Sequence, residues 1–205
     1  MRADSLGRCA EMKPGPQQGG KGQHWERICP GPIPFLTLDG QKRVVIRRLR
    51  SGETELLKDF LYEAIFIPEG QRPPDREIVE RPELRLYYEG FGTGPADHCL
   101  VAEMENRVVG AVWTRIMEDY GHVDGETPSL ALSLLPECRG QGIGSRLLQE
   151  MLSLLKGQGY RQASLAVQKA NYAAKMYRKA GFETIRETDE EYIMVKKLED
   201  MEEHQ

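Results

Sequence analysis

Residues 136–148 read PECRGQGIGSRLL, and this short stretch decides how the chain folds. Three glycines, Gly140, Gly142 and Gly144, alternate after Arg139 and lead into an apolar-periodic run. Glycine tolerates positive φ and lets another group approach the backbone closely. Backbone N–H groups exposed at the start of a helix bind phosphate, assisted by the helix dipole. Because the stretch follows a strand pattern and opens a helical one, it predicts a cradle for an anion, above all a pyrophosphate.

Two common phosphate-binding motifs do not fit this stretch. A Walker A loop continues after its last glycine with Lys and then Ser or Thr, whereas Gly144 is followed by Ser145 and Arg146. A Rossmann fingerprint has the spacing GxGxxG, whereas the spacing here is GxGxG. ATP and NAD are therefore disfavoured. The other alternative is a glycine-rich turn that binds nothing, but three glycines with Arg139 at a strand-to-helix junction favour a ligand.

Composition excludes several classes of protein. The chain has 205 residues, which suits one domain with or without a tail. Its 28 Lys and Arg against 32 Asp and Glu give a net charge of −4, without the basic surplus of a nucleic-acid binder. We see no apolar run long enough to span a bilayer and no secretory signal. We therefore expect a cytoplasmic protein that binds neither nucleic acid nor membrane.

The four cysteines indicate reduced thiols rather than a metal centre. Cys9, Cys29, Cys99 and Cys138 form no CxxC pair. Cys9 and Cys29 can be read as metal ligands together with His24, but a four-ligand zinc set cannot be assembled at the usual spacings. We predict no metal site.

The first 40 residues differ in character from the rest. The stretches KPGPQQGGKGQ (13–23) and CPGPIP (29–34) crowd Pro and Gly together without apolar periodicity. Such segments bury too little apolar surface to offset the entropy of ordering. The sequence therefore predicts a flexible extension over residues 1–40 and one folded domain over residues 41–200.

From residue 43 onward the patterns become regular and predict a mixed α/β fold. A helix is expected to open with a cap at Ser51, Glu105 and Asn106 are expected to form a hairpin turn, and a late helix should be capped by Asn171 and stopped by Gly181. Strands are expected at 43–49, 98–118 (two), 129–135, 162–168 and 182–198 (two, around a polar turn), with helices at 51–66, 141–157 and 171–181 and short helices within 69–95. Because consecutive strands alternate with helical segments, the sheet should be mixed, with helices flanking it.

The glycine stretch and a second motif resemble the GCN5-related N-acetyltransferase (GNAT) superfamily. The residues RGQGIG (139–144) match the family's R/Q-x-x-G-x-G/A signature, and NYAAKMYRKAGF (171–182) is similar to its N…A..hY...GF helix. The order of elements from residue 43 to about 197 follows the family's as well. The resemblance implies a GNAT-type acyltransferase fold with acetyl-CoA as the acyl donor.

The resemblance also implies roles for particular residues. Backbone near Leu132 and Leu134 would run beside the pantetheine arm, with the Leu134 amide facing the thioester oxygen. Asn171 would cap its helix, bind the pantetheine arm, or both. Tyr177 would protonate the departing thiolate, because a phenol with a pKa of about 10 is protonated at neutral pH; from sequence alone a packed core tyrosine is the alternative. The pyrophosphate would be held by the loop residues Arg139, Gly140, Gln141, Gly142, Ile143, Gly144 and Ser145.

The general base is less clearly indicated. Many relatives carry a glutamate in the strand before the glycine loop, but residues 129–132 read SLAL, with nothing titratable. The nearest titratable side chains are Asp119, His122, Asp124 and Glu126. Glu126 lies closest to the strand and is our predicted base, with a solvated loop as the alternative.

These patterns lead to two hypotheses about function. The first is an acetyl-CoA-dependent N-acetyltransferase that acts on a primary amine of a small molecule or protein by direct attack in a ternary complex. The second is a non-catalytic module that binds or senses acyl-CoA. The glycine loop together with Tyr177 favours the enzyme, because a sensor has no use for a proton donor. Segment 66–91 is expected to wall the acceptor pocket, and the exposed strand edges are compatible with a homodimer.

Overall fold

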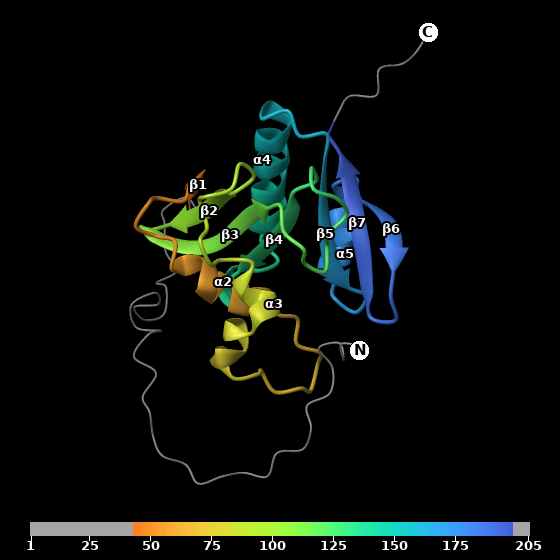
Figure 1. The fold of residues 1–205 in the computed structure, drawn as a ribbon. Helices are drawn as coiled ribbons and strands as arrows, with labels where there is room; N and C mark the ends of the chain where they lie inside the picture. Colours follow the sequence, from red (N-terminus) through yellow and green to blue (C-terminus); the bar gives the residue numbers. More distant parts are fainter. Residues whose placement is uncertain (1–42, 199–205) are drawn as a thin grey trace. The chain divides into compact units, whose positions relative to one another are not determined.

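The computed structural model describes residues 43–198, which form one sheet with helices packed against it (Figure 1). The elements in chain order are β1 (Val44–Arg48), α2 (Leu56–Ala64), the 3-10 helix η1 (Arg76–Glu80), α3 (Pro82–Arg85), β2 (His98–Met104), β3 (Arg107–Arg115), β4 (Ser129–Leu134), the 3-10 helix η2 (Pro136–Cys138), α4 (Ile143–Gly157), β5 (Gln162–Gln168), α5 (Ala173–Lys179), β6 (Glu183–Glu187) and β7 (Glu191–Lys197). This confirms the expected order of elements. The extension predicted over residues 1–40 lies outside the described residues.

The sheet is mixed, as expected, and its strand order is β1-β2-β3-β4-β5-β7-β6. All neighbouring strands are antiparallel except β4 and β5, which are parallel. These two strands share a single register pair, Ser129 with Ser164, whereas β3 and β4 share six. The parallel strands therefore part just after the start of β4 and leave a gap in the middle of the sheet.

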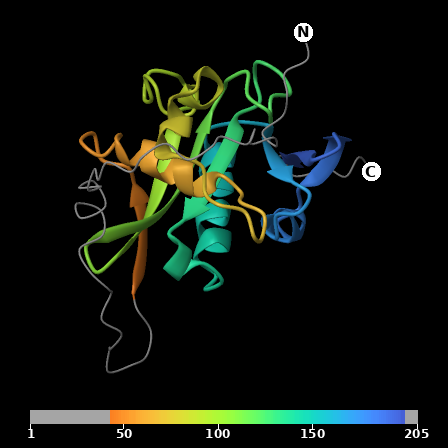
Figure 2. The same cartoon turned by 90° about the horizontal axis from the view of Figure 1, so that it is seen from below.

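Helices cover both faces of β4. Side chains alternate along a strand, so Ser129, Ala131 and Ser133 share one face. The Ser133 hydroxyl donates to the Phe60 carbonyl of α2 at 2.6 Å, which places α2 on that face. A Cβ on Gly144 of α4 would contact side chains of the other face, so α4 lies opposite. Figure 2 looks from below, the side on which α2 lies in Figure 1.

The start of α2 differs from the prediction. Ser51 does not cap the helix, which begins at Leu56 without a side-chain cap. The Arg47 guanidinium binds the Glu53 carboxylate through two hydrogen bonds of 2.7 and 2.8 Å, and that carboxylate also accepts from the Arg50 amide at 2.9 Å. Because the ion pair fixes a turn over residues 50–53, the helix starts later than its apolar pattern suggests.

The turn between β2 and β3 follows the prediction. Glu105 and Asn106 have φ values of 53° and 63° and are the non-glycine residues with positive φ among those described. Two central residues with positive φ match the right-handed twist of a hairpin. The turn fixes β3 beside β2, and β3 in turn carries β4.

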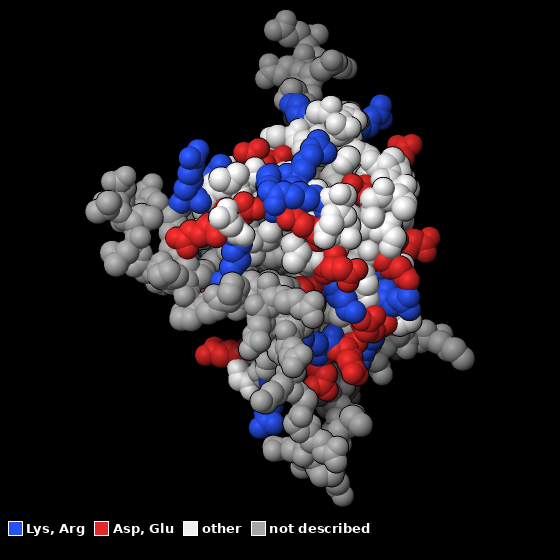
Figure 3. Space-filling view, turned by 90° about the vertical axis from the view of Figure 1, so that its left-hand side faces the viewer, with Lys and Arg blue, Asp and Glu red and all other residues white. Residues whose placement is uncertain are grey.

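The face seen in Figure 3 carries basic and acidic side chains side by side. Within residues 43–198, no helix is long and apolar enough to cross a membrane.

Candidate active site

The glycine stretch forms an open turn before α4. Gly140 and Gly142 have φ values of 72° and 80°, which L side chains rarely adopt, and a Cβ at either position would meet nothing within 4 Å. Gly142 is the residue at the helix N-cap, and the first amide to bond back to the turn is that of Arg146, to the Gly142 carbonyl at 3.1 Å. The amides of residues 140–145 donate to no backbone carbonyl within the described chain. The helix start therefore presents a row of amides suited to an anion.

Arg139 ties this turn to α2. Its Nε donates to the Leu134 carbonyl at 3.0 Å, and its Nη2 donates to the Glu63 carbonyl and the Glu63 carboxylate, each at 3.1 Å. The Glu63 side chain is only 10% exposed, and burial raises its pKa while the Arg139 charge opposes that rise. Arg139 thus fixes the shape of the turn with its side chain, a role that the sequence did not indicate.

Removing this side chain should loosen the turn. Arg139→Ala is expected to lower the free energy of unfolding by about 1–3 kcal/mol, because two carbonyls and the largely buried Glu63 carboxylate lose their donor. Urea denaturation measures the change, with Arg186→Ala on the exposed strand β6 as the control. Equal stability of the two variants would show that Arg139 does not hold the turn.

The backbone of β4 faces the gap with amides that pair with no strand among residues 43–198. The Leu135 amide donates to the Val109 carbonyl of β3 at 2.9 Å, whereas the Pro128 carbonyl accepts from the Ser164 amide of β5 at 2.9 Å. Backbone N–H and C=O groups alternate in direction along a strand. The N–H and C=O groups of Leu132 and Leu134 therefore point toward β5. Neither residue has a register partner there. Both amides are therefore open to a ligand that lies in the gap.

The middle of α5 lies against this same region. A Cβ on Gly144 would lie 3.4 Å from the Leu134 side chain, 3.6 Å from that of Leu132 and 3.6 Å from the Met176 sulfur of α5. The turn, the far half of β4 and α5 therefore meet at one place. The side chain of Ile143, the first residue of α4, is buried, and Ser145 is exposed.

Tyr177 on α5 is 6% exposed and packs edge-on against Phe182, with ring centroids 5.8 Å apart. Burial raises the pKa of its phenol, so the hydroxyl stays protonated. The protonated hydroxyl can therefore serve as a proton donor.

Asn171 caps α5 as predicted. Its side-chain oxygen accepts from the Ala173 amide at 2.9 Å, and its carbonyl accepts from the Ala174 amide at 3.1 Å. The side-chain NH2 remains available for a ligand. By contrast, the Gln141 side chain folds back and donates to the Glu137 carbonyl at 2.9 Å.

Comparison with known proteins identifies the family. The sequence matches the Acetyltransferase (GNAT) family over residues 61–182, more than half of the chain. The chain belongs to the GNAT family. A thialysine N-epsilon-acetyltransferase of Bos taurus is 28% identical over 156 residues, which cover 71% of this chain and 88% of that protein. An uncharacterized N-acetyltransferase of Archaeoglobus fulgidus is 25% identical over 136 residues, covering 63% of this chain and 87% of that protein.

Solved structures share the GNAT fold. The ribosomal-protein-S18-alanine N-acetyltransferase from Escherichia coli has a TM-score of 0.54 at 16% identity and covers 80% of this chain and 99% of its own. A GNAT family acetyltransferase from Brucella melitensis, in complex with acetyl-CoA, has a TM-score of 0.51 at 23% identity. The match covers 78% of this chain and 91% of that one. At these identities the likeness concerns the fold.

The loop that precedes β4 in this GNAT chain separates the candidate bases. Glu126, the predicted base, is exposed, and its own amide donates to the Asp124 carboxylate at 2.9 Å. Asp119 is instead largely buried, and its Oδ2 accepts from the Ser129 hydroxyl at 2.6 Å and from the Tyr87 hydroxyl at 2.8 Å. Asp119 is thus bonded to the first residue of β4, whereas the Glu126 side chain is exposed. Tyr87 belongs to segment 66–91, which was expected to wall the acceptor pocket.

A close contact holds this loop in place. A Cβ on Gly121 would lie 2.8 Å from the Ser129 hydroxyl oxygen, 2.9 Å from the Ala166 nitrogen and 3.0 Å from the Leu165 carbonyl carbon. Gly121→Ala should therefore force the loop away from β4 and β5 and lower the free energy of unfolding by about 1–3 kcal/mol. Gly125→Ala in the same loop is the matched control, since a Cβ there would meet nothing within 4 Å. Chemical denaturation compares the two, and equal stabilities would contradict the close packing.

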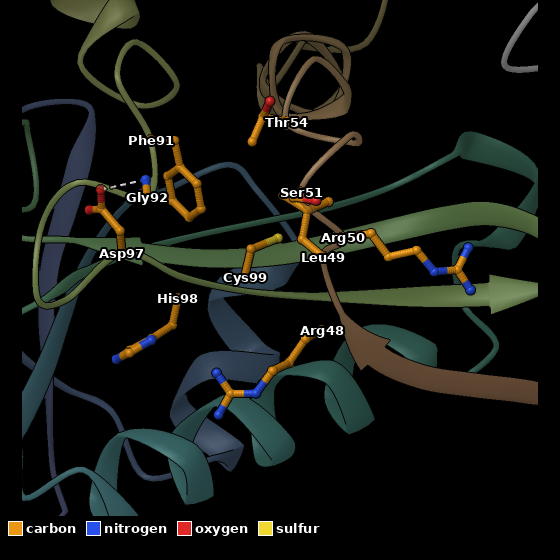
Figure 4. A pocket seen from close by; sticks show the side chains of 10 residues that line it. All are labelled: Arg48, Leu49, Arg50, Ser51, Thr54, Phe91, Gly92, Asp97, His98 and Cys99. Atoms are coloured by element: carbon orange, nitrogen blue, oxygen red, sulfur yellow. Dashed lines mark hydrogen bonds between the residues drawn. The ribbon is translucent and has the colours of Figure 1, made fainter.

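A separate pocket lies near the start of β2 (Figure 4). It has a volume of about 340 Å³ and is lined by Arg48, Leu49, Arg50, Ser51, Thr54, Phe91, Gly92, Asp97, His98 and Cys99. None of these residues belongs to β4, α4 or α5, the elements that surround the glycine turn and the gap. Nor does any group of three His, Cys, Asp or Glu side chains placed to hold a metal ion occur within the part of the chain that the structure describes.

Proposed function

We propose that this GNAT acetyltransferase transfers the acetyl group of acetyl-CoA directly to a primary amine while both substrates are bound. Family membership makes the chain an N-acetyltransferase that uses acetyl-CoA. The observation that carries the finer proposal is the gap between β4 and β5, where the amides of Leu132 and Leu134 face no strand. A donor molecule in the gap can pair with β4 in the manner of an added strand.

The residues around the gap fit the donor along its length. The amides of residues 140–145 and the N-terminal end of α4 would bind its pyrophosphate, because they are unpaired donors at the positive end of a helix dipole. The Asn171 NH2 would bind the pantetheine arm. When bound, acetyl-CoA supplies an activated acyl group as a thioester. The backbone of this chain would therefore make most of the contacts that hold the donor.

The reaction needs an oxyanion donor and a proton donor. The Leu134 amide, which points into the gap, would donate a hydrogen bond to the thioester oxygen and stabilise the charge that develops there. Tyr177 would give its proton to the departing thiolate. Because the pKa of its phenol is raised, the hydroxyl carries that proton at neutral pH. Cys138, the cysteine next to the loop, is 2% exposed, which supports direct transfer rather than a thiol nucleophile.

The acceptor is proposed to be a primary amine. The names of two similar proteins place the acetyl group on a side-chain nitrogen of thialysine and on an alanine of ribosomal protein S18. Tyr87 of segment 66–91 donates to Asp119, which also accepts from Ser129 at the start of β4. This part of the segment therefore lies on the α2 side of the gap. An amine entering from this side would meet the acyl group from the face opposite α4.

Calorimetric titration of acetyl-CoA, ATP and NAD into the full chain tests the donor site. We expect acetyl-CoA alone to bind in the micromolar range, on the order of −8 kcal/mol. Release of CoA is then followed with L-thialysine, L-lysine and a peptide that begins with alanine. Binding without CoA release for any amine would favour a sensing module, and absence of acetyl-CoA binding by folded protein would overturn the proposal.

A further inference from the structure

We propose that Asp119 takes the proton from the acceptor ammonium, and that Tyr87 and Ser129 position its carboxylate. The inference rests on the function proposed above and assigns the group that makes the amine nucleophilic. An ammonium has no lone pair, so it must lose a proton before it can attack the thioester carbon. No titratable side chain of β4 is available for this step, because the strand consists of Ser, Leu and Ala.

Asp119 lies where the gap begins. Its Oδ2 is 2.6 Å from the hydroxyl of Ser129, which is the residue of β4 that still pairs with β5. Two residues later, Gly121 packs on the β5 backbone at Leu165 and Ala166, just beyond the last pair. The loop therefore bridges the two strands at the closed end of the gap. The Leu134 amide, which would face the thioester oxygen, follows Ser129 by five residues, a distance of roughly 17 Å along the strand, so a chain of water molecules along the gap would carry the proton from the amine to Asp119.

The two oxygens of the carboxylate have different surroundings. Oδ2 accepts from the hydroxyls of both Tyr87 and Ser129, at 2.8 and 2.6 Å. Oδ1 is buried and accepts no hydrogen bond of regular geometry, although the amides of Gly121 and Asp119 lie close enough to favour the charged form. A buried acceptor of this kind calls for a donor. The ammonium, or a water molecule that it binds, supplies one.

The protonation equilibrium of this carboxylate suits a base. Burial raises the pKa of Asp119, while the hydrogen bonds from Ser129, Tyr87 and the amides oppose the rise. A carboxyl pKa closer to neutrality makes proton uptake more favourable. Burial and the Asp119 charge raise the pKa of Tyr87, so Tyr87 remains a donor.

Other titratable groups face Asp119 from the elements around it. Glu191, at the start of β7, is half-buried, and its pKa is raised by burial and then by the charges of Glu190 and Asp119. Tyr120 and His122 belong to the same loop as Asp119, and the His122 amide donates to the Asp119 carbonyl at 3.2 Å. These neighbours add negative charge on balance and favour a cationic acceptor.

The proposed base and acid serve opposite faces of the sheet. Ser129 shares its face of β4 with Ser133, which α2 covers, whereas α5 with Tyr177 meets Gly144 on the α4 face. An ammonium with three protons becomes an amide with one. The nitrogen therefore loses two protons. The first passes to Asp119 and then to solvent. The second replaces the proton that Tyr177 gives to the sulfur, so the reaction releases one proton in total. The bond between carbon and nitrogen forms as the bond between carbon and sulfur breaks.

Asp119→Asn tests this role with the fastest acceptor of the three amines above. We expect turnover to fall by about 10²- to 10⁴-fold, with acetyl-CoA affinity unchanged within about threefold. Hydroxylamine, which is neutral at pH 7 and needs no base, should restore acetyl transfer in the variant. Glu118→Gln, an exposed neighbour in the sequence, is the control. Loss of turnover that hydroxylamine does not restore would overturn the proposal, as would a normal rate in Asp119→Asn; a slow Glu126→Gln would then assign the role to Glu126.

Two further variants keep the test decisive if Asp119→Asn does not fold. Ser129→Ala and Tyr87→Phe each remove one donor to the carboxylate and should raise its pKa further. Because a base must be deprotonated, the acid limb of the kcat/KM profile should move to higher pH in both. An unmoved limb would overturn the role of Asp119. Failure of acetyl-CoA to bind would instead overturn the proposed function, so the two outcomes are distinguishable.

Discussion

Gly142→Asp is expected to weaken acetyl-CoA binding by roughly 30- to 700-fold. The new carboxylate would stand at the N-cap of α4, among amides that are proposed to hold a pyrophosphate. Two like charges about 4 Å apart repel by about 4 kcal/mol at an effective dielectric constant of 20, and solvent screening reduces this to about 2–4 kcal/mol. Each 1.4 kcal/mol corresponds to about tenfold in affinity. Calorimetry with acetyl-CoA measures the effect.

Gly142→Asn separates charge from backbone strain. Asn and Asp have almost the same shape, and both tolerate the left-handed conformation that Gly142 adopts at φ 80°. The Asn variant should therefore lose no more than about tenfold in affinity. Gly157→Ala, at the other end of the same helix, should leave binding unchanged. Equal losses in the Asn and Asp variants would mean that the turn binds no anion.

Tyr177→Phe should lower turnover by about 10²- to 10⁴-fold, the usual range for loss of a general acid. The change removes one hydroxyl and preserves the ring that packs against Phe182, so the melting temperature should hardly change. Acetyl-CoA affinity should stay within about threefold. Steady-state kinetics of CoA release, combined with calorimetry, separate the two effects. Tyr172→Phe, which alters an exposed tyrosine at the start of the same helix, is the control.

The pH dependence gives a second check on Tyr177. An acid must carry its proton to act, and burial raises the pKa of this phenol above its usual value of about 10. The loss of activity that follows deprotonation of Tyr177 is thus displaced to still higher pH. We expect wild-type turnover to show no decline from this group below about pH 10. A decline near neutral pH that Tyr177→Phe abolishes would contradict the assignment.

The sequence alone was sufficient to predict the family and the order of elements. Glycines with positive φ, the apolar stripe of α4 and the residues of the Glu105–Asn106 turn act through local conformational preferences, which depend on near neighbours in the chain. The predicted start of α2 was wrong because the Arg47 guanidinium binds the Glu53 carboxylate, and this contact competes with capping by Ser51. Local signals therefore fail where a charged pair from outside the helix decides its start.

The arrangement of the candidate site depends on contacts between distant parts of the chain, which the sequence does not show. Glu126 was favoured as the base because it is nearest to β4 in sequence, yet the hydroxyl of Ser129 bonds to Asp119, ten residues earlier. The contact of Arg139 with Glu63 joins residues 76 positions apart.

The sequence by itself determined the GNAT motifs, the order of elements and the glycine turn, because apolar periodicity and glycine conformations depend on near neighbours in the chain. Only the tertiary structure decided which carboxylate lies at the gap and which amides of β4 are unpaired. The direction of an amide depends on which strand lies beside it, and the burial of a carboxylate depends on what packs over it. Neither property is carried by one segment of sequence alone.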